Sequence, residues 1–194
     1  LSIISQLTSA LSFPLWGSIA DRFSNKSVLR VAGPFFLLCF LALTFTNFPE
    51  PHFLTMPLLV IIHIIMGIST AGVTLAAGNI GLKLAPKGSA TSYLAGISIF
   101  TALAAGITPV IGGYFVDHLA ECELAWNLSW RSPGFQVTIP TLQLQHWDFF
   151  FVLAFVLGLY SIHRLSYVVE EGEIDESIFI DSLIAYGKDM RNFS

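Results

Sequence analysis

Five long apolar stretches, separated by short polar breaks, decide what this chain can fold into. They cover approximately residues 1–20, 28–46, 53–84, 90–116 and 149–167. Each reaches or approaches the roughly 20 residues that cross the hydrocarbon core of a bilayer. Only 11% of the 194 residues are charged, too few for a water-facing surface, because soluble domains carry about 25%. The sequence therefore predicts an all-α membrane protein with five transmembrane helices.

The Lys and Arg residues alternate between the two sides of this arrangement. Eight of the nine fall on one side, and Arg131 alone falls on the other. The positive-inside rule places the basic side in the cytoplasm, and we expect a plasma (inner) membrane location. The net charge of -4 gives no support for a nucleic-acid partner, because phosphate binding requires clustered basic residues.

The segments outside the transmembrane region, residues 1–168, are expected to form an external loop at about 118–147 and a cytoplasmic acidic tail at 169–194. In the loop, residues 135–139 and 142–145 alternate apolar and polar on either side of Pro140. This pattern predicts a small β-hairpin or two short edge strands. The tail begins with an acidic run, and apolar residues between 178 and 186 then form a weak amphipathic pattern; a solvated tail is the alternative.

The start of the chain lies inside an apolar stretch. Leu1 is not Met, and no basic n-region precedes the stretch, so it does not have the pattern of a signal peptide. We expect the chain to be a fragment that lacks its N-terminal part.

A polar break follows the first apolar stretch, with Gly17, Asp21, Arg22 and Lys26 as its main residues. An Asp at a helix end can accept hydrogen bonds from the N-terminus of a neighbouring helix, where the helix dipole favours negative charge. Such a contact forms and breaks as helices rock, so it can latch one conformation. The alternative is that the charged residues only anchor the helix end at the membrane surface.

The spacing of these four residues, G-x-x-x-D-R-x-x-x-K, resembles the loop motif of the major facilitator superfamily (MFS). Ser24 stands where a Gly is usual and Ser27 where a second basic residue is usual. These departures favour the second, weaker copy of the motif. The resemblance thus implies helices eight to twelve, in the C-terminal half of a twelve-helix transporter. The acidic tail favours the same half, because the central loop of the family is usually basic.

Two further stretches resemble parts of the same family. Gly106, Pro109, Gly112 and Gly113 form a pattern similar to the P-x-x-G-G of its fifth and eleventh helices. Small residues permit close helix approach, so we expect a packing or hinge face; ligand contact is the alternative. Residues 79–93 resemble the link between the fourth and fifth helices of either half. The three motifs occur in the order of the family's five consecutive helices.

Substrate, by this resemblance, binds near the membrane midplane between two six-helix halves. Polar groups inside the spans are therefore the candidate cavity-lining residues: Gln6, Ser9, His63, Thr70 and Thr74. His63 can titrate and relay a proton, or it is a neutral His bonded to a neighbouring helix. No charged residue lies deep in these spans, so a proton-coupling carboxylate would have to lie in missing sequence.

The function predicted from these features is secondary active transport of a small solute by alternating access. The expected partners are the lipid bilayer, a small-molecule substrate coupled to protons or another ion, and the missing N-terminal half of the same chain. The alternatives are an ABC-type permease subunit, since such permeases use a separate ATPase, and another polytopic membrane protein without transport catalysis. A membrane enzyme would need paired reactive residues, so no catalytic residue, metal or cofactor is expected.

Overall fold

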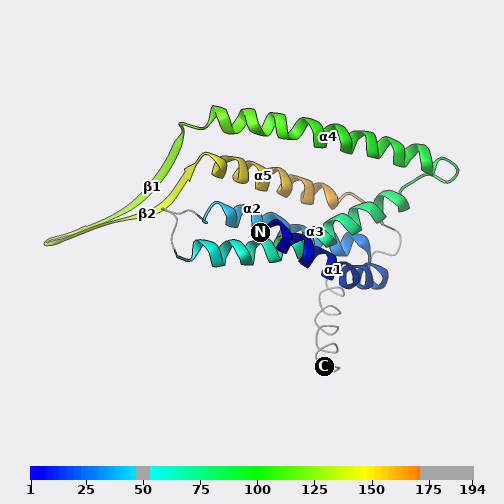
Figure 1. Cartoon of the computed structure of the whole chain (residues 1–194), viewed down its shortest axis with the longest axis horizontal. Coiled ribbons are helices and arrows are strands. Elements are labelled where there is room, and N and C mark those ends of the chain that lie inside the picture. The colour runs from blue at the N-terminus through cyan, green and yellow to red at the C-terminus, as the bar shows by residue number, and fades with distance from the viewer. Residues whose placement is uncertain (47–52, 171–194) are drawn as a thin grey trace, which may run out of the picture.

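The computed structural model describes residues 1–46 and 53–170, which form five α-helices and one two-stranded sheet (Figure 1). The elements are α1 (Ser2–Arg22), α2 (Asn25–Leu43), α3 (Thr55–Lys83), α4 (Ala90–His118), β1 (Glu123–Ser132), β2 (Phe135–Gln145) and α5 (Trp147–Leu165). The predicted fold class, a helical membrane protein with a small hairpin, is confirmed. The amphipathic pattern expected between 178 and 186 lies outside the described residues.

Four of the helices, α2 to α5, are long and apolar enough to cross a membrane. α1, the expected first span, has a sufficient length of 21 residues but does not belong to that set. Five Ser, one Thr and one Gln lie along it and lower its hydropathy. Four of these polar residues line a groove between α1 and α3: Ser2, Ser5, Gln6 and Ser9.

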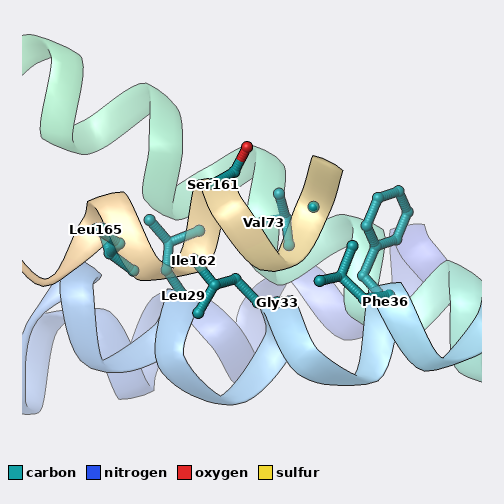
Figure 2. Close-up of a pocket in the computed structure, with 9 residues that line it drawn as sticks. Leu29, Gly33, Phe36, Val73, Ser161, Ile162 and Leu165 are labelled. Atoms are coloured by element: carbon teal, nitrogen blue, oxygen red, sulfur yellow. The ribbon is translucent and has the colours of Figure 1, made fainter. Parts of the chain in front are cut away.

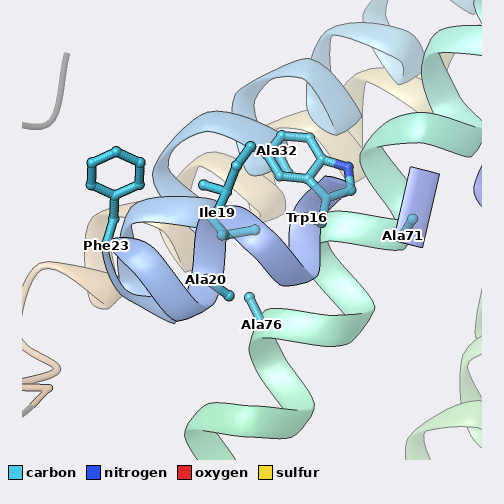
Figure 3. Close-up of a cluster of buried hydrophobic side chains, with 8 residues drawn as sticks. Trp16, Ile19, Ala20, Phe23, Ala32, Ala71 and Ala76 are labelled. Atoms are coloured by element: carbon cyan, nitrogen blue, oxygen red, sulfur yellow. The ribbon is translucent and has the colours of Figure 1, made fainter. Parts of the chain in front are cut away.

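Helices α1, α2 and α3 pack around one hydrophobic cluster. Its residues are Trp16, Ile19, Ala20, Phe23, Val28, Ala32, Ala71 and Ala76 (Figure 3). A Cβ added to Gly72 of α3 would lie 2.7 Å from the Cβ of Ala32 in α2, so a small residue is required at this crossing. The indole Nε1 of Trp16 donates a hydrogen bond to the Ile68 carbonyl over 2.8 Å and joins α1 to α3.

Helix α5 packs on α2 through two glycines. Gly33 of α2 faces the Ile162 side chain, and Gly158 of α5 faces Leu37. A pocket of about 320 Å³ lies between α2, α3 and α5 (Figure 2). Its lining is almost entirely apolar, and the Ser161 hydroxyl donates to the Leu157 carbonyl of its own helix. This pocket therefore offers little to orient a polar solute.

Few residues of the other described elements pack against helix α4. It runs alongside α5 at the edge of the bundle (Figure 1), and its main contacts among the described elements are with α5 and α3. Of its 29 residues, only Gly112 and Val116 are buried.

The hairpin differs from the one expected from the sequence. Residues 135–139 and 142–145 do not pair with each other; they belong to the single strand β2, which pairs antiparallel with β1. The chain reverses near Gly134, whose φ of 88° suits glycine. Pro140 lies inside β2 at a bulge, where Thr141 has no partner in β1. A proline has no N–H to donate and is tolerated at such an irregularity, which is why it does not separate two strands here.

Candidate functional site

A polar groove of about 290 Å³ lies between α1 and α3. Its lining residues are Ser2, Ser5, Gln6, Ser9, His63, Met66, Gly67 and Thr70. Four of the five predicted cavity-lining residues are thus brought together from two helices. Thr74, the fifth, is exposed one turn further along α3 and does not line the groove.

Gly67 sets the separation of the two helices that form the groove. A Cβ at this position would collide with the backbone carbonyl of Ser5 and with the Thr8 hydroxyl. The Thr8 hydroxyl donates to the Ile4 carbonyl of its own helix over 2.9 Å. The close approach therefore depends on the missing side chain of Gly67, since the Ser5 backbone cannot rotate away.

Hydrogen bonds within the protein satisfy only some of the polar groups of the groove. Thr70 Oγ1 donates to the Met66 carbonyl over 2.6 Å. His63 Nδ1 lies 2.8 Å from the Leu59 carbonyl in the same helix, and among the described residues its ring makes no hydrogen bond to a neighbouring helix. A carbonyl oxygen only accepts, so Nδ1 carries the hydrogen. In the neutral ring, Nε2 is then the acceptor. Within the described residues, the buried Ser5 Oγ has no hydrogen-bond partner.

A second polar cluster, the Glu170 junction, ties together the ends of α2, α3 and α5. Its residues are Ser24, Asn25, Lys26, Asn79, Lys83 and Glu170. Ser24 is the N-cap of α2, and its hydroxyl accepts from the Ser27 backbone N–H over 3.0 Å. The two Ser residues that depart from the family motif thus begin a helix with a favourable cap.

The Glu170 carboxylate completes this cap from the other end of the chain. Its Oε2 accepts from the Lys26 backbone N–H over 2.7 Å. Its Oε1 accepts from the Asn25 backbone N–H over 3.2 Å and from the Asn25 side-chain amide over 2.8 Å. A carboxylate at this position satisfies N–H groups that have no partner within the helix and interacts favourably with the helix dipole.

Side chains from the other helices close the junction. Lys83 Nζ of α3 lies 2.6 Å from Glu170 Oε1, and the Asn79 amide donates to Asn25 Oδ1 over 3.0 Å. Lys26 Nζ donates to the Val168 carbonyl over 2.6 Å, just beyond α5. Lys26 therefore uses its backbone and its side chain to hold the same segment.

The charge state of Glu170 follows from these contacts. Burial raises the pKa of its carboxyl, but the hydrogen bonds from Lys83, from the Lys26 backbone and from Asn25 together outweigh that effect. The pKa of Glu170 is therefore held below its ordinary value, and the group is ionised at neutral pH.

The predicted latch residues lie beside the Glu170 junction but do not all belong to it. Asp21 is exposed and makes no hydrogen bond among the described residues, and the Arg22 guanidinium lies 5.6 Å from the centroid of the Phe23 ring. Gly17 is half-buried, and a Cβ there would make an ordinary contact with Leu75. Of the four, only Lys26 is part of the junction. Glu170, which the motif did not indicate, occupies the helix N-terminus expected for Asp21.

The small residues of α4 are largely without neighbours among the described elements. Added Cβ atoms at Gly106 and Gly113 would meet nothing within 4 Å, and Pro109 is exposed. A Cβ at Gly112 would lie 3.0 Å from a ring carbon of Phe150 in α5. Gly112 is therefore the one residue of this pattern for which the described structure gives a close packing contact.

Comparison with known families decides which kind of membrane protein this is. The sequence model of the Major Facilitator Superfamily matches residues 1–159, which include α1 to α4 and most of α5. The chain belongs to the Major Facilitator Superfamily. Searches among curated proteins and among solved structures found no match.

The resemblance drawn from the three motifs is thereby confirmed at the level of the family. MFS proteins are membrane transporters of small molecules and are generally not enzymes. The chain is accordingly a multi-pass membrane protein of a transporter family, with the bilayer and a small-molecule substrate as partners. Among the described residues, no group of three or more His, Cys, Asp or Glu is placed to hold a metal ion.

Proposed function

We propose that this MFS chain is the C-terminal half, helices eight to twelve, of a secondary active transporter that works by alternating access. The observation that carries the proposal is the groove between α1 and α3, in which uncharged polar side chains gather. Hydrocarbon cannot satisfy such groups. The groove must therefore face water or other protein, as a transport cavity does.

The lining of the groove sets the kind of solute that it suits. It offers hydroxyls, an amide and an imidazole, and its eight residues include no carboxylate, ammonium or guanidinium. An uncharged polar solute finds donors and acceptors here, whereas a charged solute would need a counter-charge supplied by another part of the transporter. His63 is the one titratable side chain in the lining, so it is the candidate in this groove for coupling transport to protons.

The opposite wall of the cavity belongs, in this proposal, to a partner half of the same chain. The exposed Gln6 is a polar side chain that such a wall can meet. The same reasoning applies to α4, whose Gly106, Pro109 and Gly113 face no described helix. These small residues suit close approach by a moving neighbour.

The Glu170 junction and Asp21 have separate roles at the basic end of the bundle. We place this end on the cytoplasmic side of a plasma membrane. The junction holds three helix ends of this half together, so they move as one body. Asp21 is exposed beside it and can reach a helix N-terminus of the partner half. Asp21 then acts as the conformational latch, and Gly17 and Arg22 shape the helix end that carries it.

Alternating access can be tested without knowing the substrate. Ser9→Cys, in a full-length transporter with Cys39→Ser and Cys122→Ser, is exposed to a membrane-impermeant thiol reagent from each side of sealed vesicles. Ser9 lines the groove but is buried in this structure, so labelling requires the groove to open, and we expect it from both sides because the groove opens to each in turn. Leu157→Cys is the control, because Leu157 is an exposed apolar residue of the spanning helix α5 and should stay unlabelled. Absence of Ser9→Cys labelling, or labelling from one side only, would contradict the proposal.

A further inference from the structure

The β1–β2 hairpin has one mainly apolar face, on which Ser132 at the tip is the polar exception. The register pairs Leu124 with Leu144, Trp126 with Leu142, Leu128 with Ile139 and Trp130 with Val137. Side chains of directly paired residues lie on the same face of a sheet. The intervening pairs, such as Ser129 with Thr138 and Arg131 with Gln136, form the opposite face, which is mainly polar.

The bulge in β2 preserves this separation. Val137 and Ile139 precede it at odd positions, and Leu142 and Leu144 follow it at even positions. One extra residue in a strand moves all later side chains to the other face. Thr141 is that extra residue, so the bulge keeps all four apolar side chains together.

The described residues leave most of this face uncovered. The side chains of Trp126, Leu128 and Trp130 are 70%, 63% and 64% exposed, whereas Leu144 at the base of the hairpin is buried. A two-stranded hairpin is marginally stable in water at best. A face of this size and composition therefore requires a covering surface.

Two short connections hold the base of the hairpin at the membrane boundary. Four residues separate the end of α4 at His118 from Glu123, and His146 alone separates Gln145 from α5. Both helices are long and apolar enough to cross the membrane, and Figure 1 shows the hairpin leaving their adjoining ends.

The aromatic residues at this end match those of a membrane interface. Trp147 begins α5 and packs edge-on against Phe150, with 6.2 Å between ring centroids. Trp126 and Trp130 lie further along the hairpin, on its apolar face. Trp residues concentrate where a bilayer meets water, because the indole ring has an apolar body and one polar N–H.

We propose that in the membrane the hairpin, which projects beyond the helix ends in Figure 1, folds back at its two short connections, so that its apolar face lies on the bilayer surface around the ends of α4 and α5 with Trp126 and Trp130 at the level of the lipid headgroups. The apolar pairs carry no charged side chain, and Glu123 and Arg131 lie among the polar pairs and balance in charge. The contact is therefore apolar and does not select anionic lipids. The hairpin adds a membrane-bound element beside the external opening of the transporter.

Neighbouring residues on opposite faces provide a matched test. In the full-length protein with Cys39→Ser and Cys122→Ser, an environment-sensitive fluorophore is attached to Leu128→Cys or to Ser129→Cys in phosphatidylcholine vesicles. A nitroxide-labelled lipid should quench the fluorophore at 128 several-fold more than at 129, and iodide should give the reverse order. Equal iodide quenching at both positions would overturn the proposal. Shielding of position 128 from both quenchers would also overturn it, because another protein surface would then cover the face.

A second measurement does not depend on a label. Arg131 is the single Lys or Arg between residues 118 and 147 and is exposed, so trypsin cleavage of the hairpin occurs there. Leu128→Asp should release the hairpin from the bilayer and speed cleavage several-fold, whereas Ser129→Asp should leave the rate unchanged. Equal rates for the two variants in vesicles would contradict the membrane contact.

Discussion

Two regions of the chain differ in how completely they are packed. The three-helix core of α1, α2 and α3, with α5 on α2, has buried small residues and hydrogen bonds that join its helices. α4 and the hairpin are mostly exposed and apolar. The first region can hold its shape through its own contacts, whereas the second depends on surfaces outside the described residues, which we assign to lipid and to a partner half.

The largest effect is expected where the packed region is tightest. Gly67→Val should lower the free energy of unfolding by about 3 kcal/mol, because the new side chain meets the Ser5 backbone. Thermal unfolding in detergent measures the loss. Gly78→Val in the same helix is the control, because a Cβ there meets nothing within 4 Å. Equal losses in the two variants would show that the α1–α3 crossing is not the tight contact described.

The Glu170 junction should give the next largest effect. Glu170→Gln removes the charge that Lys83 and the N-terminus of α2 share, and we expect a loss of about 1–2 kcal/mol in the free energy of unfolding. Thermal unfolding again measures it, and Glu121→Gln in the connection between α4 and β1 is the matched control. A variant as stable as the wild type would place Glu170 outside the packed region.

Acidification should remove the same contribution from the wild-type protein. The pKa of Glu170 is lowered by folding, so its stabilisation is complete above the unfolded value of about 4.3 and is lost as the pH falls through the folded value. The difference in unfolding temperature between the wild type and Glu170→Gln should therefore shrink below about pH 4. A difference that stays constant down to pH 3 would contradict the assignment.

Asp21→Asn should shift the balance between the two transport conformations while leaving the stability of the protein unchanged. Asp21 makes no hydrogen bond within the described residues, so the unfolding temperature and expression should stay near those of the wild type. The ratio of labelling from the two sides at Ser9→Cys should change about twofold to fivefold, the value of one charge at a helix N-terminus, and transport should fall. An unchanged ratio would leave Asp21 as a membrane-surface anchor only.

The smallest effect is expected on α4. Gly113→Ala should change the free energy of unfolding by less than about 0.5 kcal/mol, because the added methyl group meets nothing within 4 Å among the described residues. Gly112→Leu should cost more, since the position faces Phe150. If the two variants are equally destabilised, α4 is covered by protein in the purified state, and the contrast between the two regions is weaker than described.

The fold class and the family could be predicted because they depend on local features. Apolar length identifies membrane helices, and the motif around Asp21, followed by the Pro109 pattern, has the order of the family. Four of the five residues predicted from the sequence do line the groove, since polar residues inside apolar stretches are few.

The Glu170 junction could not be predicted, because it depends on tertiary contacts. Glu170 and Asn25 are 145 positions apart, and local spacing cannot tell which carboxylate reaches a helix N-terminus. A usable signal existed at Ser24, since Ser at the start of a helical stretch predicts an N-cap. The hairpin register was missed because Pro140 suggested a turn, although the alternation of Leu124, Trp126, Leu128 and Trp130 marks a strand of its own.

The sequence distance within the Glu170 junction has a consequence for how the protein is made. A ribosome delivers Asn25 and Lys26 long before Glu170, so the start of α2 must wait for its final hydrogen-bond acceptors until α5 has entered the membrane. Closure of the junction thus requires the ends of α2, α3 and α5 to be in place together. A chain that stalls before Glu170 leaves the amides of Asn25 and Lys26 without these acceptors.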